Sequence, residues 1–407
     1  MKTILKLGAF LITACIAADA QVVPQATASR ANLNYALRYS QSGVFQNDNQ
    51  TSWQMNASAE VDCANGNERF PFTLDYGGGY TRNLAGPSIA TGVFQRLLIS
   101  QGYAARRWNV LASDSVYYLP QSPAIGFSGI PGTGEPIGGS GSIPSSTLPI
   151  LAVNTRIVNN DAKAEFGVDL NNLTTLSLGG KSQTLRFLDG NGQDTDAPAA
   201  NARISQRLDA RNSLAGEFSY SRFSYGDSTF TLAINTVLID YHRAWTRHIS
   251  TDASVGPQWV KDSEKAALPA STRFSASAAL NYRFRFGSTN LSYNHQVNSG
   301  GGFLLGTMSD SADLGYSHEF GRNFGIGISG GYARHSGLTN NEIISGRVGG
   351  VQATWRLNRY VSLFVDYTAI DQSSSSSSPQ NNLLNQLEQV FAFGIGYAPR
   401  ATRHARY

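Results

Sequence analysis

Three features of the sequence predict an all-β fold, a closed antiparallel up-and-down barrel of about 18 strands, with 16 as the nearest alternative. Runs of about ten to fourteen residues alternate apolar and polar side chains, which is the period of a β-strand. Short polar turns and longer loops rich in Gly, Ser, Asn and Pro follow one another in strict alternation. After the N-terminus, no apolar run is long enough for a membrane-spanning helix, so a helical membrane protein is excluded.

Composition supports a β-rich chain and excludes other classes. Of 407 residues, 41% are hydrophobic and only 15% are charged, against about 25% in average proteins. The 41 glycines and 14 prolines fit many turns. The net charge of +4 comes from charges spread singly along the chain, without a basic run, so we do not expect nucleic-acid binding.

The first twenty residues are predicted to be a signal peptide. Lys2 and Lys6 precede an apolar stretch, and an A-x-A cleavage site ends at Ala20. A lipoprotein-type cleavage before Cys15, in "ITAC", is the alternative. Residues 21–31 then form a short N-terminal segment. Cleavage after Ala20 leaves Cys63, which excludes an internal disulfide; we expect Cys63 to be a turn residue.

Eighteen alternating runs make up the predicted barrel domain, residues 32–398, and residues 399–407 form a C-terminal tail. The runs lie at 32–39, 51–62, 71–82, 91–104, 107–119, 153–168, 173–187, 200–208, 213–225, 229–243, 249–261, 272–285, 289–298, 310–319, 324–335, 343–356, 360–370 and 388–398. In 229–243 the apolar phase shifts, which predicts a β-bulge near Asn235 and Thr236. The segment 380–390 is the best candidate for a short loop helix.

Turns and loops sort to opposite ends of the predicted barrel. Tight turns are expected near 106–107, 171–172, 209–212, 246–248, 286–288, 321–323 and 358–359, with a less compact one at 63–68. Longer loops are expected at 40–50, 83–90, 120–152, 189–199, 226–228, 262–271, 299–309, 336–342 and 371–386. An even strand number then places both chain ends on the side of the short turns.

The two faces of the strands indicate which side is wet. In 51–62, one face reads Gln, Asn, Ser, Glu, Asp, too polar for a packed core, whereas the other reads Trp, Met, Ala, Ala, Val. A soluble sandwich has strands of about five or six residues, whereas roughly nine to eleven tilted residues cross a bilayer. Aromatic residues near strand ends, such as Trp108, Tyr282, Phe284, Phe286 and Trp355, fit interfacial girdles. The pattern therefore predicts a transmembrane barrel with an apolar outside and a wet lumen.

This pattern resembles the porin-like outer-membrane β-barrels of Gram-negative bacteria over nearly all of 32–398, without a family-specific motif. The resemblance implies the bacterial outer membrane as location, with outer-membrane lipid and the barrel-assembly machinery as partners. The strand "VFAFGIGY" resembles the aromatic closing strand that such barrels present to that machinery, although "APRATRHARY" follows it.

Other motifs do not predict an enzyme, a metal site or a cofactor. Gly325, Gly327 and Gly330 match a dinucleotide fingerprint by letters but lie inside an alternating run, so they are expected to make the lumen face small. The six histidines lack metal-ligand spacing. His242 beside Asp240 is a lumen pair or half of a catalytic dyad, without a nucleophile marked by spacing.

Polar and charged residues on the predicted wet faces are the candidate site. These candidate lumen-lining residues are Arg273, Arg283, Arg285, Asn281, Asn294, Gln296, Glu60, Asp313, Glu319 and Asp366. Because their charges are mixed, the sequence does not predict an ion preference. The long loop 120–152, which includes Phe127 and Glu135, is the candidate constriction if it folds into the lumen.

Arginines recur at the predicted short turns, which would face the periplasm. They are Arg106, Arg107, Arg211, Arg247, Arg322 and Arg359. Turn chemistry and solubility explain them; the alternative hypothesis is that they bind phosphate head groups of the inner leaflet through bidentate hydrogen bonds.

Three functions follow in order of preference. The first is a porin-like channel for passive or substrate-preferring diffusion of small polar solutes, because about eighteen strands enclose an aqueous lumen. The second is a non-conducting structural or interaction barrel, and the third is a barrel hydrolase. The solute and the oligomeric state are not predicted.

Overall fold

The computed structural model of the chain describes residues 32–46, 51–65, 67–86, 92–119, 156–190, 192–226, 228–262, 271–300, 304–339, 342–375 and 386–398. The predicted signal peptide, the segment 21–31, the loop 120–152 and the tail 399–407 lie outside these residues. Among the described residues, no helix has the length and apolar character needed to cross a bilayer.

Eighteen strands form a single sheet. They are β1 (Asn32–Gln46), β2 (Thr51–Ala64), β3 (Phe72–Ala85), β4 (Gly92–Ala104), β5 (Trp108–Leu119), β6 (Ile157–Asp169), β7 (Thr174–Phe187), β8 (Thr195–Arg207), β9 (Asn212–Tyr225), β10 (Thr231–Ala244), β11 (Ile249–Asp262), β12 (Ser271–Phe284), β13 (Gly287–Asn298), β14 (Thr307–Phe320), β15 (Phe324–Gly337), β16 (Ile343–Arg356), β17 (Val361–Ser374) and β18 (Gln386–Tyr397).

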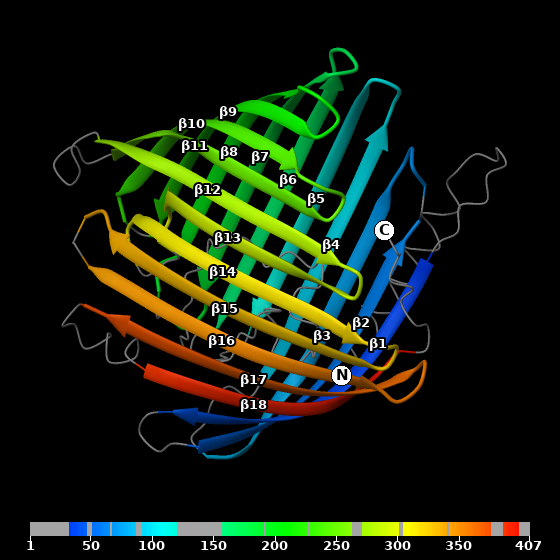
Figure 1. The fold of residues 1–407 in the computed structure, drawn as a ribbon. Coiled ribbons are helices and arrows are strands. Elements are labelled where there is room, and N and C mark those ends of the chain that lie inside the picture. Colours follow the sequence, from blue (N-terminus) through cyan, green and yellow to red (C-terminus); the bar gives the residue numbers. More distant parts are fainter. Residues whose placement is uncertain are drawn as a thin grey trace.

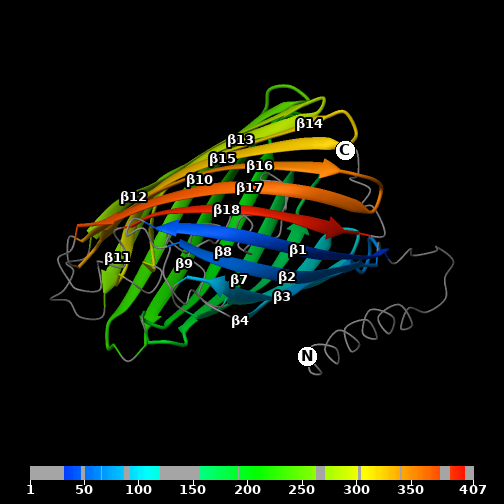
Figure 2. The ribbon, with the colours of Figure 1, turned by 90° about the horizontal axis from the view of Figure 1, so that it is seen from below.

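The sheet closes on itself. Each strand pairs antiparallel with its neighbour in sequence, and β1 also pairs with β18 from Leu37↔Tyr397 to Gln46↔Glu388. The result is an up-and-down barrel with strongly inclined strands (Figures 1 and 2). Closure gives every strand two hydrogen-bonded neighbours, so no sheet edge is left open. The predicted fold class is confirmed.

Some predicted boundaries are wrong. The first strand continues from residue 39 to Gln46, where Ser40, Ser42 and Gly43 resemble a loop by composition but pair with both β2 and β18. β8 begins at Thr195 rather than at 200. Residues 386–390 belong to β18 and not to a helix. In each case, cross-strand pairing on both sides decides the conformation over local propensity.

Contacts between strands that are not neighbours identify the inside of the barrel. The hydroxyl of Tyr225 on β9 donates a hydrogen bond to the carbonyl of Ser299, after β13, at 3.0 Å. Gln258 on β11 accepts one from the amide of Val297 on β13 at 2.9 Å. These strands are not adjacent in the sheet, so the contacts pass through the lumen. Paired residues share a face, so the register extends this assignment to every strand.

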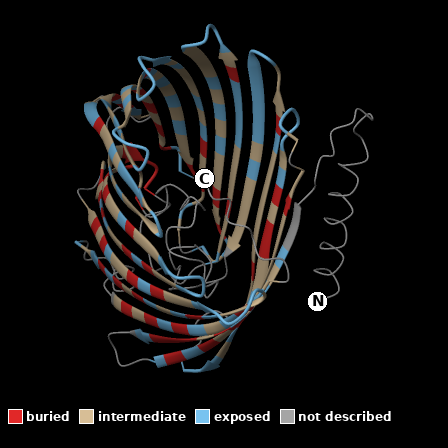
Figure 3. Cartoon of the chain, turned by 45° about the vertical axis from the view of Figure 1, so that its right-hand side comes forward, coloured by how far each residue is buried: buried red, intermediate tan, exposed pale blue. Residues whose placement is uncertain are grey.

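The opposite face is apolar and exposed. Its large side chains include Tyr35, Leu37 and Tyr39 on β1, Val237, Ile239 and Tyr241 on β10, and Phe391, Phe393 and Ile395 on β18. Figure 3 shows the alternation of exposure along the strands. In water this surface would be unfavourable, whereas in lipid it needs no partner.

Aromatic residues gather on the outer face near the short turns. The rings of Phe70, Tyr103 and Trp108 contact one another in series, with both ring-centroid distances at 5.0 Å. On the β12–β14 side, the rings of Phe284 and Tyr316 stack at 5.8 Å. Amphipathic rings at one level of a barrel are typical of the membrane–water interface.

The predicted β-bulge in β10 is wrong. The β9–β10 register runs without a shift from Thr231↔Ser224 to Arg243↔Asn212. The phase shift arises because Leu232 and Ile234 are apolar residues on the inward face, whereas Val237 and Ile239 are on the outward face. Cys63 is likewise not a turn residue: it lies in β2 and is buried next to Leu74 and Tyr76.

Candidate functional site: the lumen and the β13–β14 tip

The lumen wall of β1–β4 carries a chain of ion pairs. The Arg38 guanidinium lies 3.5 Å from the carboxylate of Glu60. Arg96 lies between Glu60 at 3.0 Å and Asp75 at 2.9 Å. These side chains come together because they occupy inward positions on the neighbouring strands β1 to β4. Each arginine thus has a carboxylate partner.

Two further groups continue around the wall. On β6 and β7, the ammonium groups of Lys163 and Lys181 lie 3.5 and 2.9 Å from Asp161. On β8–β10, Arg203 contacts both Glu217, at 3.2 Å, and Asp240. The middle and the short-turn half of the lumen are therefore lined by charges that are largely paired.

A His–Asp pair lies next to this network. Nδ1 of His242 is 2.6 Å from Oδ1 of Asp252 on β11, so the predicted pairing with Asp240 is wrong, because Asp240 contacts Arg203 instead. Ser213 is the cross-strand neighbour of His242 on β9. Among the described residues, no hydrogen bond joins Ser213 to His242.

One acidic group approaches metal-ligand geometry. Carboxylate oxygens of Glu60, Asp62 and Asp75 lie within 4.8 Å of one another. Arg96 already contacts two of these carboxylates, which compensates their charge. We assign no metal to this group.

Exposure on the inward face changes along the barrel axis. Near the short turns, Lys163, Glu165, Asn281 and Arg283 are exposed on the lumen wall. Near the long loops, many inward side chains are buried, among them Ser52, Gln54 and Thr307, whereas Arg273 is exposed. The lumen is therefore open at the short-turn end and narrows toward the long-loop end.

The end of the β13–β14 hairpin contributes to this narrowing. We call residues 296–300 and 304–308 the β13–β14 tip. β13 pairs with β12 only as far as His295↔Ala276, and the first five residues of β12, 271–275, pair with β11 alone. Beyond that point β13 separates from β12 and the tip bends into the lumen, while Thr307 and Met308 stay paired with β15.

Polar contacts hold the β13–β14 tip inside. The Gln258 side chain accepts from the Val297 amide and donates to Thr236 at 3.2 Å. Tyr225 donates to the Ser299 carbonyl. On the other side, the amide of Leu338 donates to the Gly306 carbonyl at 3.0 Å. Satisfied backbone groups allow the segment to be buried.

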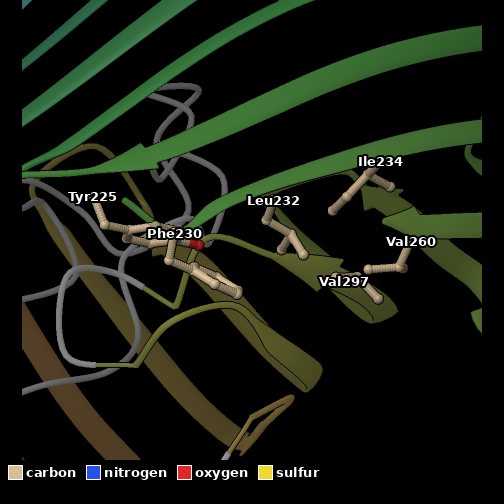
Figure 4. Close-up of a cluster of buried hydrophobic side chains, with 6 residues drawn as sticks. All are labelled: Tyr225, Phe230, Leu232, Ile234, Val260 and Val297. Atoms are coloured by element: carbon tan, nitrogen blue, oxygen red, sulfur yellow. The ribbon is translucent and has the colours of Figure 1, made fainter. Parts of the chain in front are cut away.

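An apolar cluster lies beneath the tip (Figure 4). It consists of Tyr225, Phe230, Leu232, Ile234, Val260 and Val297, which come from β9, β10, β11, β13 and the β9–β10 loop. Leu305, Met308 and Leu338 pack against it. Gly306 has a φ of +74°, and a Cβ at this position would lie 2.8 Å from Cδ2 of Leu232. A glycine is therefore required for this approach.

The candidate lumen-lining residues have the following places. Asn281, Arg273 and Arg283 are on the inward face of β12, Asn294 and Gln296 on that of β13, and Glu60, Asp313, Glu319 and Asp366 on those of β2, β14 and β17. Glu319 pairs with Arg356 at 3.1 Å. Arg285 lies in the β12–β13 turn, with its guanidinium 4.9 Å from the ring centroid of Phe286, and not on the wall.

The glycines of β15 are divided between the two faces. Gly325 and Gly327 are inward, whereas Gly330 is outward. The inward pair leaves the wall of β15 small, as the sequence predicts.

The sequence analysis does not predict the β13–β14 tip. The predicted constriction, with Phe127 and Glu135, lies outside the described residues. The signal for the tip was present in the apolar inward residues Leu232 and Ile234, which a wet lumen wall does not need. These two residues do not indicate a bulge. They form part of the surface on which the β13–β14 tip packs.

The six turn arginines are exposed at the short-turn end, as the sequence predicts. Arg359 lies over the ring of Tyr360, 4.5 Å from its centroid. The nearby Asp209, in the β8–β9 turn, accepts hydrogen bonds from the Asn212 side chain and the Arg211 amide. These bonds lower the pKa of Asp209 below its usual range.

The protein is a closed 18-stranded barrel with an apolar outer face and a lumen wall of polar and charged side chains. No protein-family model matches the chain, and no curated protein matches it. Among solved structures, it is similar to OccK2 (OpdF) of Pseudomonas aeruginosa, with a TM-score of 0.47 and 12% identity, covering 90% of this chain and 98% of that one.

Two other solved structures are similar at the same level. For the outer membrane protein opdK of Pseudomonas aeruginosa, the TM-score is 0.45 with 8% identity, covering 90% of this chain and 99% of that one. For OccAB2 of Acinetobacter baumannii, the TM-score is 0.47 with 8% identity, covering 91% and 98%. At these values the likeness assigns neither a family nor a solute to this chain.

Proposed function

We propose that the protein is a channel of the bacterial outer membrane through which small polar solutes diffuse. The observation that carries this proposal is the reversal of polarity across one wall: exposed apolar side chains outside, and exposed polar and charged side chains such as Asn281 and Glu165 inside. A closed barrel is also the only sheet that a bilayer admits.

The β13–β14 tip is the proposed constriction. It fills part of the lumen near the long loops, where the chain would face the outside of the cell. The solute path then leads from this narrow entrance into the wider, charged half near the short turns. A hydrolase is the weaker alternative, since the His242–Asp252 pair lacks a described serine hydroxyl that donates to it.

Solute entry into liposomes tests the proposal. Mature protein is refolded into liposomes loaded with an impermeant polymer, and swelling is followed in isotonic solutions of neutral sugars of increasing size. We expect rapid swelling with small sugars and slower swelling as size increases. No swelling with folded, inserted protein contradicts the channel and favours a non-conducting barrel.

We also propose that the six turn arginines bind lipid phosphates of the inner leaflet. Guanidinium groups bind phosphate through paired hydrogen bonds, and the exposed arginines lie at one end of the barrel beside the aromatic band. Replacing all six with Gln should weaken assembly in anionic bilayers but not in zwitterionic ones. Equal assembly of wild type and variant in anionic bilayers contradicts this role.

A further inference from the structure

We infer that the channel prefers cations over anions. This inference rests on the proposed channel function and specifies its solute class. It is carried by the ion-pair geometry of the inner wall: among the described residues, basic side chains between the two ends of the barrel all have carboxylate partners, whereas several carboxylates have no basic partner.

Most basic groups are neutralised where the wall is lined, although Lys163 and Lys181 share the single carboxylate of Asp161. Arg38, Arg96, Lys163, Lys181 and Arg203 each lie within an ion pair. Three described inward arginines form no ion pair. Arg207 and Arg283 lie at the short-turn ends of β8 and β12, and Arg273 lies near the long-loop end of β12, opposite Gln258. Between these three arginines, an anion passing along the wall meets one basic charge in excess, at the Lys163–Asp161–Lys181 group.

Carboxylates remain in excess along the same wall. Glu165, Asp313 and Asp366 face the lumen from β6, β14 and β17, and none forms an ion pair among the described residues. Arg203 is shared by two carboxylates, and Asp252 has only a histidine as partner. Charges of one sign in a cleft with low-dielectric walls concentrate counter-ions, here cations.

The remaining loops do not reverse this balance. Between residues 47 and 385, the segments outside the described residues contain a single basic residue, Lys265, and four acidic residues, Asp48, Glu135, Asp227 and Glu264. The positive net charge of the whole chain therefore comes from groups at the turns, the outer face and the termini, and not from the lumen.

The reversal potential in a salt gradient tests the inference. Refolded protein is placed in a planar bilayer between 0.1 M and 1 M KCl, because a Debye length of about 10 Å at 0.1 M keeps the wall charges effective. We expect the reversal potential to have the sign that K⁺ permeation produces in this gradient. The triple variant Glu165→Gln, Asp313→Asn, Asp366→Asn should shift the reversal potential toward anions, and Asp366→Asn alone should shift it part of the way.

β17 offers a matched control. Asp371→Asn removes the same charge from the same strand, but Asp371 is exposed on the outward face. It should leave the reversal potential unchanged. An anion-preferring wild type, or a triple variant with unchanged preference, overturns the inference and leaves the channel intact. A wild type that inserts without conducting overturns the channel and the inference together.

Discussion

Gly306→Ala tests how the β13–β14 tip is held in the lumen. Gly306 has a φ of +74°, which L-residues rarely adopt, and its backbone lies against Leu232, which is fully buried. The added methyl group would lie 2.8 Å from Cδ2 of Leu232 and 3.2 Å from Cδ1 of Leu338. The substitution therefore opposes docking both through the backbone and through packing.

The magnitude follows from these two effects. Placing an L-residue in the left-handed region costs about 1–2 kcal/mol. Overpacking a close-packed cluster costs about 1–3 kcal/mol. Together they disfavour the docked tip by about 2–5 kcal/mol, and each 1.4 kcal/mol changes an equilibrium tenfold. We expect the docked fraction to fall at least about 30-fold relative to the released one.

Single-channel recording reads out the tip directly. If the tip narrows the lumen, Gly306→Ala should give a larger conductance or frequent transitions to a larger level. Gly321→Ala is the matched control, because Gly321 has a similar φ of +68° at the other end of β14 but nothing within 4 Å of its added methyl group. Identical conductance for Gly306→Ala and wild type would refute the assignment of the tip as a constriction.

Three further predictions concern the wall and a turn. A cysteine at Asn281 should react with a charged, water-soluble thiol reagent, whereas one at its outward neighbour Leu280 should not; equal reactivity contradicts the assignment of faces. Gly394→Ala should lower the stability of the refolded barrel in urea, because the methyl group would clash with an aromatic ring and a backbone carbonyl; an unchanged urea midpoint contradicts this. The carboxylate of Asp209 has a lowered pKa in the folded turn, due first to its hydrogen bond from the Asn212 side chain, so its contribution is present at neutral pH and is lost as pH falls through about 4 and below. The stability difference between wild type and Asp209→Asn should accordingly shrink on acidification, and a constant difference contradicts it.

The barrel could be predicted because a strand with one polar and one apolar face alternates polar and apolar residues with a period of two in the sequence. Tight turns such as 321–323 have the polar residues that turns require, and they set the strand number. The predicted strand boundaries are wrong where small polar residues belong to a strand, as in 40–46. Ser and Gly in this segment resemble a loop by composition, and only the pairing with β2 and β18 shows that they are part of β1.

The candidate site was predictable only in part. Alternation identifies inward residues such as Asp313 and Asp366, but not which charges neutralise one another, because Arg96 reaches Glu60 across an intervening strand. Docking of the β13–β14 tip depends on contacts between distant segments, such as Tyr225 with Ser299. Apolar residues on an otherwise polar lumen face, such as Leu232 and Ile234, are the local sequence signal for such docking. A bulge would instead shift the register between β9 and β10, which stays continuous.

The most direct test of the central claim is the conductance of the refolded mature protein in a planar lipid bilayer. A water-filled lumen lined by exposed charges predicts discrete, reproducible current steps on insertion. Folded protein that inserts at high load and produces no steps would contradict the claim that the lumen is open to water and ions.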